Sequence, residues 1–421
     1  MSSTAHQSVD GVAGIRTLYR QTRQTSLAIC DPLQDEDFVV QSMLEVSPTK
    51  WHLAHTSWFF ENFLLKPRLP DYREFNKQFG FLFNSYYYTV GSMHQRAERG
   101  MLTRPTVAET RQYRAHVDEH MEQLLEKHGE EATIRDLIVL GINHEQQHQE
   151  LMLTDIKHVF SRNPLLPAYS QPNPSPFSAP TELTFISGKK GVVEIGYNEN
   201  SFCFDNEKPR HQQVLIPHAL ANRLVTNGEY REFIQDGGYT TTELWLSDGW
   251  ATICEQNWSR PLYWMEDLQQ EFTLSGLRPL NDNEPVCHVS YFEADAFARW
   301  SGYRLPTEAE WETAATGTEV SGNFLGTGQF HPTSNTAGKG LQQLFGDTWE
   351  WTQSPYVCYP GYKLPQGPTS EYNGKFMCNQ WVLRGGSCVT PDGHARLTYR
   401  NFFYAHDRWQ FTGIRLAKDC S

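Results

Sequence analysis

The segment GINHEQQHQELMLTDIKH contains His144 and His148, two histidines four residues apart, with Glu145 directly after the first. Residues four apart lie on one face of a helix, so both imidazoles can reach the same metal ion. Gly141 and Asp155 extend this face in the two directions. The spacing predicts a pair of metal ligands on the side of a helix that faces a protein core.

The pattern His-Glu-x-x-His is also the signature of zinc proteases, in which the glutamate acts as the general base. A common form of that signature has a further histidine downstream, where this chain has Thr154. A distant glutamate ligand is an alternative, and so is a hydrogen-bonded polar patch that holds no metal. We expect a metal site of another kind, in which Glu145 is incidental.

An earlier segment, WHLAHTSWFFEN, offers a third ligand. On a helix, Trp51, His55 and Trp58 share one face with Asn62, whereas His52 lies on another. We therefore predict that His55 joins the two later histidines and that His52 stays outside the ligand set. Three histidines leave coordination positions open, which suits catalysis, and they suit zinc and iron alike.

Helices must position these histidines. Apolar residues recur at spacings of three and four in segments 37–46, 50–65, 107–128 and 133–160, which predicts a four-helix bundle. Segment 76–106, between the second and third patterns, lacks this period. A loop of this length inside a compact domain is usually functional.

The second half of the chain has a different character. Six prolines in residues 163–180 indicate an extended linker. Beyond it, glycine, tryptophan and short apolar runs dominate, with helical patterns only at 226–237 and 290–316. We predict an irregular α+β domain after an all-α domain. The predicted bounds are 1–162 for the bundle, 163–181 for the linker and 182–421 for the second domain.

Composition excludes several classes of protein. The net charge of −13 argues against nucleic-acid binding. The sequence contains no run of about 18 apolar residues and no signal-peptide pattern, so we expect a cytoplasmic protein that does not span a membrane. The eight cysteines form no CxxC pair, which argues against a zinc ribbon and is typical of buried, reduced thiols.

These residues resemble a known family. His55 in WHLAH, with His144 and His148 in HEQQHQE, resembles the iron-binding pattern of the DinB-like bundle in sulfoxide synthases of ergothioneine biosynthesis, the EgtB family. The second half is similar to formylglycine-generating enzymes, whose fold resembles C-type lectins. The motifs of that similarity are FDNEKPRHQQV, VTNGEYREFI, YRLPTEAEWE, FGDTWEWTQS, VLRGGSC and GIRLA.

One departure from the second family matters. Formylglycine-generating enzymes have a cysteine pair after the RGGS motif, whereas this chain has Cys388 directly after the motif's serine, and Thr390 stands where the first cysteine of the pair is expected. The resemblance therefore implies the fold without the copper–thiol chemistry. We expect Cys388 to be a packed thiol.

The EgtB resemblance implies a non-haem Fe(II) enzyme that uses dioxygen. It joins the sulfur of cysteine, or of γ-glutamylcysteine, to the imidazole C2 of hercynine and forms a sulfoxide. The resemblance also implies a catalytic tyrosine pair, here Tyr86 and Tyr87, that donates a proton near the iron. Tyr88 extends the run and leaves the register open, and a packing cluster against the second domain is the alternative.

Candidate substrate contacts follow from the chemistry of the substrates. Arg96 and Arg99 lie just beyond the tyrosines and suit the carboxylate of an amino-acid donor, although a solvated basic loop is the alternative. By resemblance, Gln147 bonds the substrate imidazole. By resemblance, Asn401, Phe402 and Phe403 also lie at a motif that contacts the substrate, where aromatic faces suit the trimethylammonium group of hercynine, and a lectin-like core loop is the alternative.

Three rival functions stay open at this point. A selenoneine synthase would attach selenium from a selenosugar to hercynine. A DinB-like zinc-dependent thiol transferase would need no oxygen. A lectin-like binding module on a helical bundle would have no catalytic function and would keep its ligand when the histidines are removed.

Overall fold

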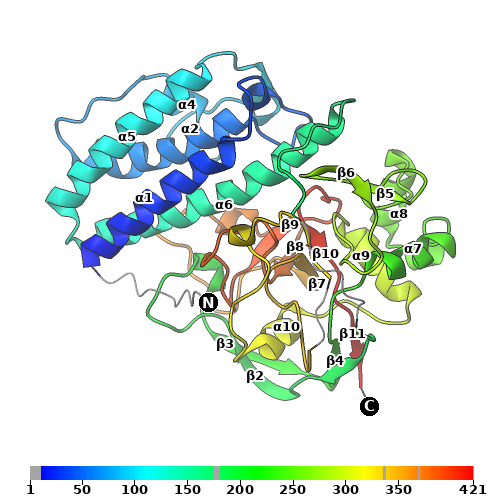
Figure 1. The fold of residues 1–421 in the computed structure, drawn as a ribbon. Helices are drawn as coiled ribbons and strands as arrows, with labels where there is room; N and C mark the ends of the chain where they lie inside the picture. Colours follow the sequence, from blue (N-terminus) through cyan, green and yellow to red (C-terminus); the bar gives the residue numbers. More distant parts are fainter. Residues whose placement is uncertain (1–10, 174–180, 335–337, 368–369, 421) are drawn as a thin grey trace. The chain divides into compact units, whose positions relative to one another are not determined.

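The computed structural model describes residues 11–173, 181–334, 338–367 and 370–420, which form two compact units (Figure 1). The first unit consists of residues 11–164, together with short later segments at 200–202, 366–367 and 370–371. The second unit consists of the other described residues. The bounds that we predicted for the linker and the two domains stay a prediction, and residues 174–180 of that linker lie outside the described residues.

The first unit is a bundle of four long helices that run side by side in Figure 1. Helix α1 packs against α6, and α2 packs against both α5 and α6. A capping box of Thr106 and Glu109 begins α5, since the threonine side chain accepts from the Glu109 N–H and the glutamate returns the bond. The four helices are α1 (Gly11–Cys30), α2 (Thr49–Phe60), α5 (Val107–His128) and α6 (Ala132–Arg162).

Three of the four predicted helices are present, and the prediction of a helix at 37–46 is wrong. That segment contains only a single 3-10 turn, Asp37–Val39, and its Val40 and Leu44 are exposed. The missing helix is α1, whose buried face includes Thr22, Arg23 and Ser26. Because these buried positions are polar, α1 does not show the continuous apolar periodicity from which a helix is predicted.

Helix α2 continues into a π-helical turn, Glu61–Leu65, and the short α3, Lys66–Arg68. Such turns in a helix frequently lie near functional sites. The loop that follows contains α4, Phe79–Leu82, and a 3-10 turn, Arg96–Met101, so segment 76–106 is ordered by local structure.

The second unit is α+β. Its main sheet has the strand order β10–β7–β8–β9, a three-stranded sheet has the order β1–β4–β11, and β2–β3 and β5–β6 are hairpins. The strands are β1 (Phe185–Ser187), β2 (Gly191–Ile195), β3 (His211–Leu215), β4 (His218–Ala221), β5 (Gln270–Thr273), β6 (Gly276–Pro279), β7 (Trp349–Pro355), β8 (Gln380–Arg384), β9 (Asn401–Tyr404), β10 (Thr412–Gly413) and β11 (Ala417–Asp419).

Three helices of the second unit begin at capping boxes, whereas α8 has no side-chain cap. Thr226, Ser290 and Thr307 cap α7, α9 and α10, each with a glutamate three residues later. The three capped helices lie in the two segments that the sequence predicts to be helical, whereas α8 was not predicted. The helices are α7 (Asn227–Gln235), α8 (Ser247–Gln256), α9 (Tyr291–Trp300) and α10 (Glu308–Ala315). The bundle followed by an α+β unit confirms the predicted fold class.

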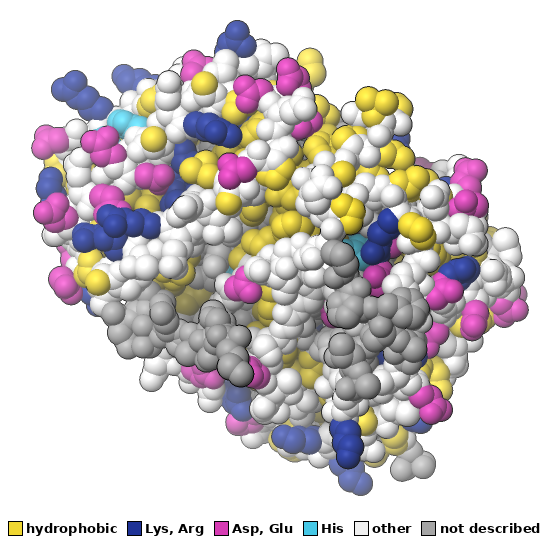
Figure 2. Space-filling model, in the orientation of Figure 1, with side chains coloured by type: hydrophobic (Ala, Val, Ile, Leu, Met, Phe, Trp, Pro, Cys, Tyr) yellow, Lys and Arg dark blue, Asp and Glu magenta, His cyan; other side chains and the backbone are white. Residues whose placement is uncertain are grey.

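The surface carries charges of both signs. Figure 2 shows Lys and Arg side chains interspersed with Asp and Glu on the displayed face. Among the described helices, none combines the length and the apolar character that crossing a membrane requires.

Candidate metal centre

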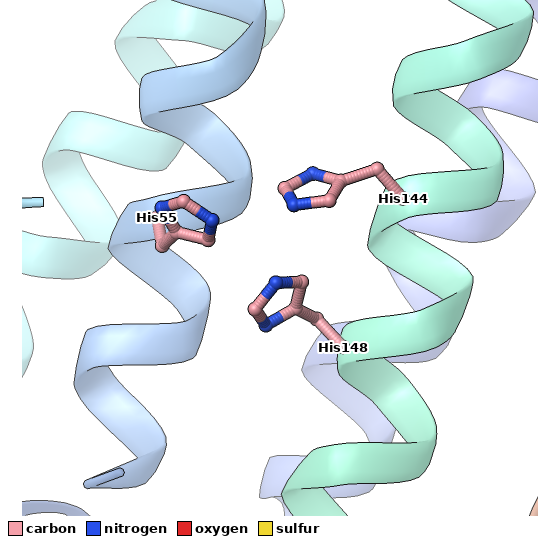
Figure 3. A group of neighbouring side chains, drawn as sticks. All are labelled: His55, His144 and His148. Atoms are coloured by element: carbon pink, nitrogen blue, oxygen red, sulfur yellow. The ribbon is translucent and has the colours of Figure 1, made fainter. Parts of the chain in front are cut away.

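Three buried histidines meet between α2 and α6. His55 comes from α2, His144 and His148 come from α6, and the three rings point toward one another (Figure 3). One nitrogen of each lies within 4.8 Å of the corresponding nitrogens of the other two. The ring centres are 4.6–4.9 Å apart. The positions that the sequence predicts as ligands are therefore brought together.

Hydrogen bonds fix how two of these rings face the site. His55 donates from Nδ1 to the carbonyl oxygen of Phe83, 2.6 Å away, which leaves Nε2 as the lone-pair nitrogen. Within the described residues this buried Nε2 has no hydrogen-bond partner. Nδ1 of His148 lies 2.8 Å from Nδ1 of His52, so its Nε2 is the nitrogen left for a ligand. Proteins usually orient a metal-binding histidine through a hydrogen bond from the ring nitrogen that does not bind the metal.

Burial keeps the three imidazoles neutral. It lowers the pKa of His144 to about 3 and holds the pKa of His55 and of His148 well below 6.5. For His55 and His148, the neighbouring His144 lowers the pKa further. Neutral imidazole is the form that binds metals. The donor set, its convergence and its protonation are compatible with a metal cofactor.

Glu145 points to a different set of partners. Its carboxylate accepts from Arg23 Nη1 at 2.8 Å, from Ser26 Oγ at 2.6 Å and from Arg114. Although burial raises the pKa of the Glu145 carboxyl, Arg114 and Arg23 outweigh this and lower it to about 2. A carboxylate bound in this way has a structural role in the bundle and is not placed to serve as the base of a zinc protease.

The tyrosine run divides into two kinds of residue. Tyr87 is buried, with its ring 5.5 Å from Trp58 and 5.0 Å from Phe63, and Tyr86 stacks on it at 4.5 Å. The two hydroxyl oxygens are 3.4 Å apart. Trp58 also stacks on His55, so only one ring separates Tyr87 from a candidate ligand.

Tyr88, in contrast, is 73% exposed. Its backbone N–H, with the N–H and hydroxyl of Thr89, donates to the carboxylate of Glu371, which belongs to the same unit. A residue far along the chain therefore anchors the loop that carries the tyrosines. The Tyr88 side chain extends into solvent.

The two candidate arginines have different environments. Arg96 is exposed and donates to the Glu45 carbonyl. Arg99 is buried, lies 3.4 Å above the Trp51 ring and donates to Ser47 Oγ at 2.9 Å. Burial, together with the nearby Arg96, lowers the pKa of Arg99, which indicates a desolvated cation that an anionic ligand would stabilise.

The other predicted substrate contacts lie in both units. Gln147 is half-buried on α6, one residue before His148. Asn401, Phe402 and Phe403 begin β9 in the second unit and are half-buried. Phe402 stacks on Tyr356 at 4.0 Å, and the Asn401 side chain accepts from the N–H of Phe402.

A second group of potential metal ligands lies in the second unit. Glu271, Glu284 and His331 are buried and close together. Arg278 donates to both carboxylates and balances their charge. We therefore interpret this group as an ion-pair network in which the Arg278 guanidinium takes the place that a metal cation would have.

Sequence reasoning named two residues beside the metal centre but missed how they are bonded. It left His52 outside the ligand set and did not foresee that His52 Nδ1 lies 2.8 Å from His148 Nδ1. Asp155 accepts from His52 Nε2 at 3.0 Å. The sequence already placed Asp155 on the helix face of His148, seven residues along, but periodicity could not give its partner on α2.

Comparison with known proteins identifies relatives of both units. Residues 18–152 match the DinB superfamily, and residues 170–339 and 334–420 match the sulfatase-modifying factor enzyme 1-like domain. A hercynine oxygenase of Mycolicibacterium thermoresistibile is 30% identical over 89% of this chain and 88% of that protein. A hercynine oxygenase of Mycobacterium tuberculosis is 31% identical over 95% of this chain and 97% of that protein. Ergothioneine biosynthesis protein 1 of Schizosaccharomyces pombe is 28% identical over 57% of this chain and 31% of that protein.

Proposed function

The chain belongs to the family of hercynine oxygenases, which are oxidoreductases, and we propose that it joins a thiol sulfur to hercynine in ergothioneine biosynthesis. The proposed donor is cysteine or γ-glutamylcysteine, and the oxidant is dioxygen. Hercynine, the thiol and O2 then give the C2-linked sulfoxide and one water. The observation that carries the proposal is the buried group of His55, His144 and His148, each of which offers a ring nitrogen within 4.8 Å of those of the other two.

We propose Fe(II) as the metal that the three histidines hold. Bound iron would supply the redox chemistry and, as a Lewis acid, would lower the pKa of a thiol bound to it. The three neutral histidines would hold the iron and would leave coordination positions open for the substrates. Binding both substrates at one centre supplies proximity.

Other residues of this chain have roles around that centre in the proposal. The hydroxyls of Tyr86 and Tyr87 provide the proton that favours C–S coupling over oxidation of the thiol. Arg99 and Arg96 bind the donor carboxylate, because the desolvated guanidinium of Arg99, which lies near the charge of Arg96, is stabilised by an anionic partner.

The proposal assigns hercynine two further sets of contacts. Gln147 bonds the imidazole. Asn401, Phe402 and Phe403 hold the trimethylammonium group, whose positive charge is attracted to aromatic faces. A cytoplasmic location stays a prediction from the sequence.

Anaerobic reconstitution with Fe(II), followed by hercynine, cysteine and then air, tests the proposal by mass spectrometry. We expect a product with the mass of hercynine plus cysteine plus one oxygen, less two hydrogens. His144→Ala should give none, and His120→Ala, which changes a half-buried histidine on α5, should give as much as the unchanged protein.

Other outcomes separate the rival functions. Product from γ-glutamylcysteine alone would identify that donor. No coupled product with either thiol, in protein shown to hold iron, would refute the proposal. In that case, product with a selenosugar would indicate selenoneine synthesis, and thiol transfer without oxygen in the zinc-loaded protein would indicate a transferase.

A further inference from the structure

Beyond its three candidate ligands, the metal centre includes a second layer of buried polar residues. His52 and Asp155 are 3% and 4% exposed and belong to α2 and α6. Nε2 of His52 lies 3.0 Å from Asp155 Oδ2, and Nδ1 of His52 lies 2.8 Å from Nδ1 of His148. The three side chains therefore form a continuous hydrogen-bonded row that ends at a candidate metal ligand.

The direction of each bond in this row follows from its chemistry. An ionised carboxylate only accepts hydrogen bonds, so His52 must donate from Nε2 to Asp155. A neutral His52 that donates from Nε2 has a lone pair at Nδ1 and accepts there. The donor to that lone pair is Nδ1–H of His148, whose own lone pair is then on Nε2, the nitrogen left for a metal.

We propose that Asp155 and His52 form a positioning relay that fixes His148 in its metal-binding tautomer and orientation. A ligand histidine that donates its other N–H is held in one rotation and is a stronger base toward the metal. The inference rests on the proposed metal site and is independent of which substrates the enzyme uses. Neither relay residue contacts the metal in this proposal, so both are positioning residues.

The same aspartate also connects the relay to the candidate donor site. Asp155 Oδ2 accepts from the Ser47 N–H at 2.9 Å, and Ser47 Oγ accepts from Arg99 at 2.9 Å. Arg99 covers Trp51, whose ring stacks on His55 at 4.5 Å. Asp155 is thus a shared anchor for a metal ligand and for the arginine proposed to bind the donor.

Titration with Co(II), in the absence of substrates, tests the relay. Co(II) binds histidine nitrogens and has visible absorption that reports its ligands, so both affinity and spectrum can be read. We expect His52→Phe, which removes both hydrogen bonds, to weaken Co(II) binding about 10–100-fold and to change the spectrum. His52→Gln, whose amide retains one donor and one acceptor, should recover part of the affinity.

The control is His158→Phe, a buried histidine on the same helix that is bonded to Ser42. Its Co(II) affinity should equal that of the unchanged protein. Equal affinity in His52→Phe and the unchanged protein, or equal losses in His52→Phe and His158→Phe, would overturn the relay.

A second variant keeps the proposal testable if His52→Phe does not fold. In that case Asp155→Leu, which keeps the size of the side chain and removes the acceptor, should weaken Co(II) binding in the same direction, and an unchanged affinity would refute the proposal. Failure of the unchanged protein to bind Co(II) would refute the metal centre itself. The two failures are therefore distinguishable.

Discussion

At the scale of single residues, similar side chains in one short run have different environments. The hydroxyls of Tyr86 and Tyr87 are 3.4 Å apart, and Tyr87 is buried, whereas Tyr88 is exposed. A proton donor near the metal must be close to the reacting atoms and shielded from bulk water. The buried position of Tyr87, one ring away from His55, favours it as that donor.

Tyr87→Phe should therefore lower the yield of the coupled sulfoxide by roughly 10²-fold, the size of a lost general acid, and increase oxidised thiol. The phenyl ring preserves the packing on Trp58 and Phe63, so Co(II) affinity should be unchanged. Product ratios by mass spectrometry measure the effect. Tyr88→Phe is the matched control and should behave like the unchanged protein. An unchanged ratio in Tyr87→Phe would remove this tyrosine from the mechanism.

At the scale of elements, the metal centre depends on how closely α2 and α6 approach. Gly141, one turn before His144, lies where the aromatic residues of α2 contact α6. A Cβ built on it would lie 2.5 Å from Phe60 Cε1 and 3.0 Å from Phe59 Cε1, and Phe59 packs against the His144 ring. The glycine thus allows the two helices to bring their histidines together.

Gly141→Ala should destabilise the protein by about 1–3 kcal/mol through overpacking, even though alanine is the better helix former. It should also weaken Co(II) binding, because the helices must separate. Urea unfolding of the metal-free protein and Co(II) titration measure the two effects. Gly80→Ala in α4, where an added Cβ meets no atom within 4 Å, should leave both unchanged or slightly raise stability. Equal results for the two variants would show that the close approach has no consequence.

At the scale of the whole molecule, all three candidate ligands belong to the helical unit. A metal that binds only the folded state stabilises it by about 2.7 kcal/mol when the free metal is about 100 times the dissociation constant. Removing the metal should therefore lower the unfolding temperature by several degrees. The ion pairs of the second unit, such as that of Arg415 with Glu350, require no metal.

Thermal unfolding with Co(II) and with a chelator measures this shift. We expect it in the unchanged protein and not in His144→Ala, at equal protein concentration. A shift of the same size in His144→Ala would place the bound metal elsewhere in the molecule.

The sequence by itself determined the two domain types, the helices that carry the histidines and which histidines share a face. It could do so because helical periodicity and short motifs are local properties of the chain. It failed at α1, where Thr22, Arg23 and Ser26 interrupt the apolar residues of the buried face, and it placed a helix at 37–46 where the residues bury no continuous face.

Only the tertiary structure decided which partners the polar side chains have. Periodicity gives the face on which a residue lies but not what packs against it. Arg23 on α1 and Arg114 on α5 reach Glu145, and His52 on α2 joins Asp155 to His148. These bonds connect residues far apart in the chain and form because buried polar groups must be satisfied once the helices pack. That requirement separates Glu145 from the metal centre and places His52 beside it.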